Sequence, residues 1–134
     1  MPAELRDPTQ PVEWLRRARS NLALARAHAN LPGVLYEDLC FDAQQAAEKG
    51  IKAVLVHLQV EFPKTHAVSE LLDLVEGAGV SVAADVREAA RLTRYAVTTR
   101  YVGLTEDVTE EEYRAAVDLA ERVLRWAEST VTVE

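Results

Sequence analysis

The sequence predicts an all-α protein, an up-and-down antiparallel bundle of four main helices plus one short helix. Apolar residues recur at three- and four-residue steps in most of the chain, which is the repeat of one face of an α-helix. Hydrophobic residues make up 49% of the 134 residues but aromatic residues only 6%, so the expected core consists mainly of Leu, Val and Ala. We expect a single helical domain over residues 1–134, with a flexible arm at 1–8 and a frayed tail at 129–134.

The first helix is expected from about residue 10 to residue 30. Thr9 is a typical capping residue, and Pro11 is tolerated in a first helical turn. The apolar stripe of this helix contains Leu15, Ala18, Leu22, Ala25 and Ala29. The sequence Leu-Pro-Gly at 31–33 ends the helix and permits a tight reversal, so the next helix should run antiparallel to it.

The second helix, expected over residues 35–60, is the central one. Ile51 and Leu55 widen its apolar stripe, which predicts contact with neighbours over much of its circumference. Cys40 lies on this apolar side and is expected to be a buried structural thiol. The opposite side has a polar line, with Gln44 and Glu48 beside it, that should face a cleft or a partner: Asp38, Asp42, Gln45, Lys49 and Lys52.

Three further helices follow in the sequence. A short third helix is expected around residues 68–75, stopped by Gly-Ala-Gly at 77–79. A fourth helix should begin with Ser81 as its cap and run to about Thr99, with an inward face of Val82, Val86, Ala89, Ala90, Thr93 and Val97. The fifth helix should begin at a capping box formed by Thr109 and Glu112, and an amphipathic pattern follows it.

Composition and charge exclude several classes of function. The net charge of −7 argues against a general nucleic-acid binder, although it allows a local basic groove. The single cysteine excludes an intrachain disulfide and a cysteine-based zinc site, and the sequence lacks the Glu-x-x-His pairs of di-metal bundles. No metal or cofactor is therefore expected. Since no apolar run approaches eighteen residues, we expect no membrane association and a cytoplasmic location.

Three pieces of the sequence together resemble the HEPN family, small all-helical domains named for higher eukaryotes, prokaryotes and nucleotide binding. The pieces are WLRRARSNL at residues 14–22, FDAQQAAEK at 41–49 and TTRY at 98–101, the last before a loop and an acidic helix start. The QQAAEK run is the most specific of them, and the resemblance covers nearly the whole chain. Relatives often have an acid at the position of Asn21.

The resemblance implies a bundle of about this size, usually a homodimer, often encoded beside a minimal nucleotidyltransferase in a toxin–antitoxin pair. Some relatives are metal-independent ribonucleases that use an Arg-x(4–6)-His motif. Counted from Arg94, the histidine window here contains Thr99, Arg100 and Tyr101, and no histidine follows His66. The imidazole that would act as general acid or base is missing, so this sequence is not expected to be a ribonuclease of the usual kind.

The candidate ligand-binding residues are hydrogen-bonding, cationic or aromatic. They are Asn21, Gln44, Gln45, Glu48, Lys49, Lys52, Arg91, Arg94, Tyr95, Arg100 and Tyr101. Guanidinium groups bind phosphate through paired hydrogen bonds, and tyrosine can stack on a base. If the second and fourth helices face each other, we expect one anion-binding groove lined by Lys49, Lys52, Arg91, Arg94 and Tyr101. The simpler alternative is that these charges only solvate the surface.

Three functional hypotheses remain open at this point. The leading one is a homodimeric binding module for a nucleotide or for a nucleotide-bearing partner, such as a nucleotidyltransferase encoded nearby. The second is a ribonuclease toxin, acting on RNA with a variant site around Arg94 and Tyr101. The third is a non-catalytic structural adaptor whose polar lines only contact other proteins.

Overall fold

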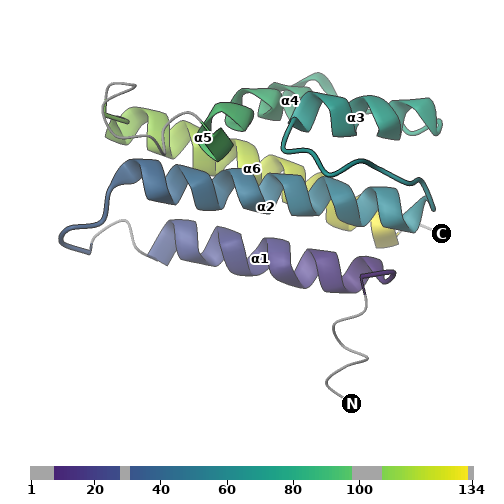
Figure 1. The fold of residues 1–134 in the computed structure, drawn as a ribbon, viewed down its shortest axis with the longest axis horizontal. Helices are drawn as coiled ribbons and strands as arrows, with labels where there is room; N and C mark the ends of the chain where they lie inside the picture. Colours follow the sequence, from purple (N-terminus) through teal and green to yellow (C-terminus); the bar gives the residue numbers. More distant parts are fainter. Residues whose placement is uncertain (1–7, 28–30, 98–106, 133–134) are drawn as a thin grey trace, which may run out of the picture.

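The computed structural model describes residues 8–27, 31–97 and 107–132, and every regular element within these ranges is helical (Figure 1). The elements are α1 (Pro11–Ala27), α2 (Tyr36–His57), α3 (Val68–Gly77), α4 (Ala84–Arg87), the 3-10 helix η2 (Glu88–Thr93), α5 (Arg94–Val97) and α6 (Glu110–Thr132). The predicted all-α bundle is thus confirmed. Three long helices, α1, α2 and α6, form its main body.

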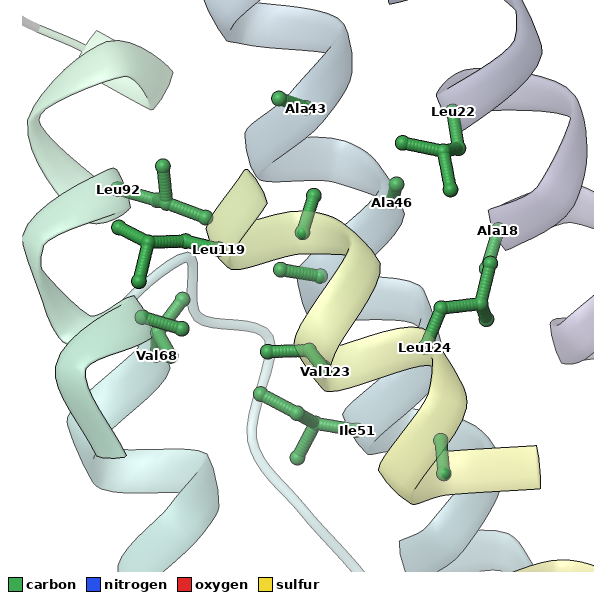
Figure 2. Close-up of a cluster of buried hydrophobic side chains, with 14 of the residues drawn as sticks. Ala18, Leu22, Ala43, Ala46, Ile51, Val68, Leu92, Leu119, Val123 and Leu124 are labelled. Atoms are coloured by element: carbon green, nitrogen blue, oxygen red, sulfur yellow. The ribbon is translucent and has the colours of Figure 1, made fainter. Parts of the chain in front are cut away.

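Helix α2 is the centre of the molecule. Figure 1 shows α1 along one side of it, α3 to α5 along the other side, and α6 behind it. Neighbours therefore cover α2 from three directions, which explains its wide apolar face. Figure 2 shows the resulting core, where side chains from five elements meet: Ala18, Leu22, Ala43, Ala46, Ile51, Val68, Leu92, Leu119, Val123 and Leu124.

The predicted fourth helix is the main error in the sequence-based fold. Residues 84–97 form a short α-turn, a 3-10 segment and a second short α-turn in place of one continuous α-helix. Apart from Ala96, the buried residues recur every three positions, at Val86, Ala89, Leu92 and Tyr95. A period of three matches the 3.0 residues per turn of a 3-10 helix better than the 3.6 of an α-helix. Ser81 does not cap this segment, because α4 begins after Ala83 without a side-chain cap.

The other helix ends follow their local signals more closely. Gly79 has a φ of 96°, a left-handed conformation that glycine adopts without strain, just after α3. The capping box of α6 is confirmed: the Glu112 amide donates to Thr109 Oγ1 at 3.1 Å and the Thr109 amide donates to Glu112 Oε1 at 2.9 Å. At the other end, α6 continues to Thr132, so residues 129–132 are helical where fraying was expected. The predicted arm lies outside the described residues except for Pro8.

Candidate functional site

The polar line of α2 lies on a side of the helix that α1 and the loop before α3 cover only in part. Gln45 and Lys49 on this side are only half-buried, whereas Gln44 and Glu48 beside them are fully or almost fully buried. Buried polar groups need hydrogen-bond partners. Here the partners come from α2 itself, from α1 and from the loop before α3.

Glu48 is the centre of a buried hydrogen-bond network. One carboxylate oxygen accepts from Gln44 Nε2 and His66 Nδ1, both at 2.9 Å, and the other accepts from Lys52 Nζ at 2.7 Å. Burial raises the pKa of the Glu48 carboxyl, but hydrogen bonds from Lys52, His66 and Gln44 outweigh burial and leave this pKa below its usual value. Glu48 is therefore a charged acceptor at neutral pH, already supplied with three donors.

Two aromatic rings complete the surroundings of Lys52. Its Nζ lies 5.8 Å from the centroid of the Trp14 ring and 5.4 Å from that of Phe62, within the range of cation–π attraction. These two rings also contact each other edge to face. The ammonium group thus interacts with Glu48 and with both rings, so its positive charge is already balanced by groups of the same domain.

A second polar group connects α1 to α2. Lys49 Nζ donates to Asn21 Oδ1 at 2.8 Å, and Asn21 Nδ2 donates to Asp42 Oδ1 at 3.2 Å. Burial, followed by repulsion from Arg17, lowers the pKa of the Lys49 ammonium group. Gln45 Nε2 donates to Gln44 Oε1 at 2.7 Å, and this hydrogen bond connects Gln45 to the Glu48 network.

The arginines of the candidate site lie elsewhere. A cavity of about 320 Å³ opens between the η2–α5 segment and α6, and it is lined by Arg91, Leu92, Arg94, Tyr95, Glu111, Glu112, Ala115, Ala116 and Leu119. We call this cavity the arginine pocket. None of the candidate residues of α2 belongs to its lining. The expected single groove is therefore divided between two places, with the lysines on the side of α2 toward α1 and the arginines against α6.

The arginine pocket contains two arginine side chains, of which one has no ionic partner among the described residues and the other is only weakly paired. Within the described part of the chain, Arg91 makes no ion pair or hydrogen bond. Arg94 Nη1 lies 3.8 Å from Glu112 Oε2, a long contact, and its guanidinium stacks 5.1 Å from the centroid of the Tyr95 ring. The same carboxylate is already engaged by Thr109 in the capping box. The guanidinium of Arg94 is thus available to another anion.

Tyr95 forms the boundary between the arginine pocket and the core. It is almost fully buried, and burial, followed by the nearby Cys40 thiol, raises the pKa of its phenol. Burial also raises the pKa of Cys40 to about 12. The structure thus agrees with the prediction that Cys40 is a buried structural thiol, because a thiol with so high a pKa is not a nucleophile at neutral pH.

The sequence analysis missed several members of this arrangement. His66, Trp14 and Phe62 were not candidate site residues, yet all three surround the Glu48–Lys52 pair. Two of them come from the loop that connects α2 to α3, and nothing in the local sequence shows where such a loop will fold back. Two predicted site residues, Arg100 and Tyr101, lie outside the described residues.

Metal sites and membrane spans were searched in the same ranges. No group of three or more His, Cys, Asp or Glu side chains in the described part of the chain is arranged to hold a metal ion. None of the described helices combines the length and the apolar character that crossing a membrane requires.

These features define a small helical-bundle domain with a polar helix face and a separate arginine pocket. The chain belongs to the HEPN domain family, whose model matches residues 12–130. Two solved structures are similar over almost their whole lengths. TT1696 from Thermus thermophilus is 35% identical, with a TM-score of 0.76 and coverage of 90% of this chain and 97% of that one. ST0689, described as an archaeal HEPN homologue, is 26% identical, with a TM-score of 0.73 and coverage of 92% and 98%. No curated protein matches the chain.

Proposed function

We propose that this HEPN domain is a non-catalytic, homodimeric binding module that takes a phosphate group of a nucleotide or of a nucleotide-bearing partner, such as a nucleotidyltransferase. The observation that carries the proposal is the pair of available guanidinium groups, Arg91 and Arg94, at one opening of about 320 Å³. Membership of the HEPN family supports the homodimer and the nucleotidyltransferase partner, because both are expected of many members.

The chemistry of the arginine pocket suits a phosphate with an attached ring system. A guanidinium group binds phosphate through two parallel hydrogen bonds, which a point charge such as an ammonium group does not match. Leu92, Ala116 and Leu119 give the pocket an apolar floor on which a base or sugar can rest. The volume lies at the lower end of the range for ligand sites, so the pocket fits part of a nucleotide rather than all of it.

Among the described residues, none that lines the arginine pocket is a suitable acid–base group, which supports binding rather than catalysis. His66 is hydrogen-bonded to Glu48 on the α2 side of the bundle and is not part of the pocket lining. Burial raises the pKa of Tyr95, which disfavours its use as a base near neutral pH. Glu111 and Glu112 also line the pocket, but the hydrogen bonds from Thr109 lower the pKa of the Glu112 carboxyl, which makes it a weaker base.

The homodimer is supported by the partly exposed polar side of α2. Gln45 and Lys49 are only half-buried in the middle of the most buried helix, although Lys49 also contacts Asn21 of α1. A second copy related by a two-fold axis would cover both faces at once. We therefore expect light scattering at micromolar concentration to give twice the chain mass of 14.9 kDa.

A variant tests whether this side of α2 is the contact. Gln45→Arg adds a positive charge beside Lys49 and is expected to shift the mass toward the monomer, since like charges would meet across the axis. Arg114→Gln is the matched control, because Arg114 is exposed on α6 and, among the described residues, bonds only Glu110 in its own helix. A monomer mass for the wild type would contradict the homodimer, and a dimer unaffected by Gln45→Arg would place the contact elsewhere.

Phosphate binding is tested by calorimetric titration with ATP, AMP and inorganic phosphate. Arg94→Ala is expected to weaken nucleotide affinity roughly ten- to a hundredfold, because a hydrogen bond to a charged group contributes about 1.5–3 kcal/mol. Arg94→Lys should recover only part of the loss, since it keeps the charge without the planar fork. Affinity should also fall with added salt, because Coulombic attraction is screened. Arg91→Ala should behave like Arg94→Ala.

The controls separate binding from folding. Arg94 is about half-exposed, so its loss should leave the helix content and the oligomeric state unchanged. Arg114→Ala removes an exposed arginine from outside the pocket and should bind as the wild type does. Equal affinity in the wild type and all Arg94 variants would remove Arg94 from the site. No heat with any of the three probes would favour the adaptor hypothesis instead.

A further inference from the structure

A second cavity, of about 330 Å³, lies between α1 and α6, away from the arginine pocket. Both helices pack mainly on α2, and a trough remains where their outer edges run side by side. Two almost fully buried leucines, Leu22 of α1 and Leu124 of α6, contribute its apolar lining. We call this cavity the α1–α6 groove.

Two ion pairs bridge the groove from one helix to the other. Arg19 Nε donates to Glu128 Oε2 at 2.6 Å, and Arg26 Nε donates to Glu121 Oε2 at 2.8 Å. The partners are seven residues apart on each helix and run in opposite order, so the pairs stand about two helical turns apart, roughly 10 Å. The leucines lie between them along the chain. The two pairs thus mark the ends of the groove.

The remaining lining residue is Arg125, which lies between Glu121 and Glu128 along α6. Both of those carboxylates are engaged by arginines of α1. Arg125 itself is exposed and makes no ion pair or hydrogen bond with the residues that the structure describes. The groove therefore combines an apolar lining, two neutralised ends and one uncompensated positive charge, in a protein whose net charge is −7.

We propose that the α1–α6 groove binds a small amphiphilic carboxylate, an acid with one negative charge and one apolar chain. Its carboxylate pairs with the guanidinium of Arg125 through two parallel hydrogen bonds. Its chain lies on Leu22 and Leu124. One negative charge balances the single uncompensated arginine, whereas a phosphate dianion would leave one negative charge in excess in the groove. The volume is at the lower end of the range for small-molecule sites.

The test is a titration of the ¹⁵N-labelled full chain with sodium octanoate, followed by amide chemical shifts. We expect saturable changes concentrated at residues 19–26 and 121–128. Sodium acetate has the charge without the chain, and 1-octanol has the chain without the charge. Each is expected to bind at least tenfold more weakly than octanoate. Equal binding by octanol and octanoate would overturn the role of the charge, and equal binding by acetate would overturn the role of the apolar lining.

A single substitution tests whether Arg125 supplies the positive charge that binds the carboxylate. Arg125→Gln is expected to weaken octanoate binding five- to tenfold without changing the helix content, because the side chain is exposed. Arg122→Gln is the matched control: Arg122 is on the same helix but pairs with Asp118 and is not part of the groove lining. It should bind octanoate as the wild type does. Unchanged affinity in Arg125→Gln, or shifts scattered over the whole chain without saturation, would overturn the proposal.

Discussion

Glu48→Ala is expected to lower the free energy of unfolding by about 3–5 kcal/mol, since removing one member of a buried ion pair leaves the other charge uncompensated. Lys52 is the charge left behind, and its side chain is only 11% exposed. Gln44, which is fully buried, loses the acceptor of its amide group at the same time. The measurement is urea denaturation followed by circular dichroism.

Three further variants show whether the cost comes from the uncompensated charge. Glu48→Gln keeps the shape and one acceptor oxygen, so its loss should be smaller than that of Glu48→Ala. Adding Lys52→Met to Glu48→Gln removes both charges and should recover part of the stability. His66→Ala should cost less than about 1 kcal/mol, because the His66 side chain is 58% exposed. A loss below about 1 kcal/mol in Glu48→Ala would show that the network does not stabilise the fold.

The same carboxylate predicts a pH dependence. The pKa of Glu48 is lower in the folded chain than its ordinary value of 4.5, so the unfolded chain takes up this proton first as the pH falls. The stabilisation is therefore fully present above about pH 4.5 and is lost as the pH falls from there through the folded pKa. The difference in stability between the wild type and Glu48→Gln should shrink in this acidic window. A difference that stays constant down to about pH 3 would contradict the shift.

Gly50→Leu is expected to lower the free energy of unfolding by about 1–3 kcal/mol through overpacking. Gly50 is buried on the side of α2 that faces α6. A Cβ atom placed there would lie 3.6 Å from Val123 Cγ1 and 3.7 Å from both Leu124 Cδ1 and Ala127 Cβ. These are ordinary contact distances, so the site has room for a methyl group. An isobutyl group would have to displace side chains of α6.

Gly50→Ala is the matched control and should have the opposite sign. Its methyl group fits without strain, and alanine is favoured over glycine in a helix by about 1 kcal/mol. We therefore expect Gly50→Ala to raise the denaturation midpoint and Gly50→Leu to lower it. Equal midpoints for Gly50→Leu and the wild type would show that α2 and α6 can separate at this position at no cost.

Much of the local structure follows from neighbouring residues in the sequence. The capping box of α6 forms as predicted because Thr109 and Glu112 are three residues apart and satisfy each other's amides without help from elsewhere. The stop after α3 needs only a glycine that accepts a positive φ, and Gly79 supplies it. The central position of α2 also follows from its own pattern, because so wide an apolar face must be covered from several directions.

The composition of the sites was decided by contacts between distant segments. Periodicity placed Lys49 and Arg94 each on a helix face, but it could not say which neighbour that face would meet. The 3-10 winding of residues 88–93 changes the angle between successive side chains, and Arg91 and Arg94 line a cavity with residues of α6 rather than of α2. His66 reaches Glu48 only because the loop after α2 folds back over that helix. The sequence by itself thus determined the helices and the central place of α2, because hydrogen bonds and apolar repeats within a helix are local. Only the tertiary structure decided which polar groups share a site, because that depends on how helices far apart in the chain pack together.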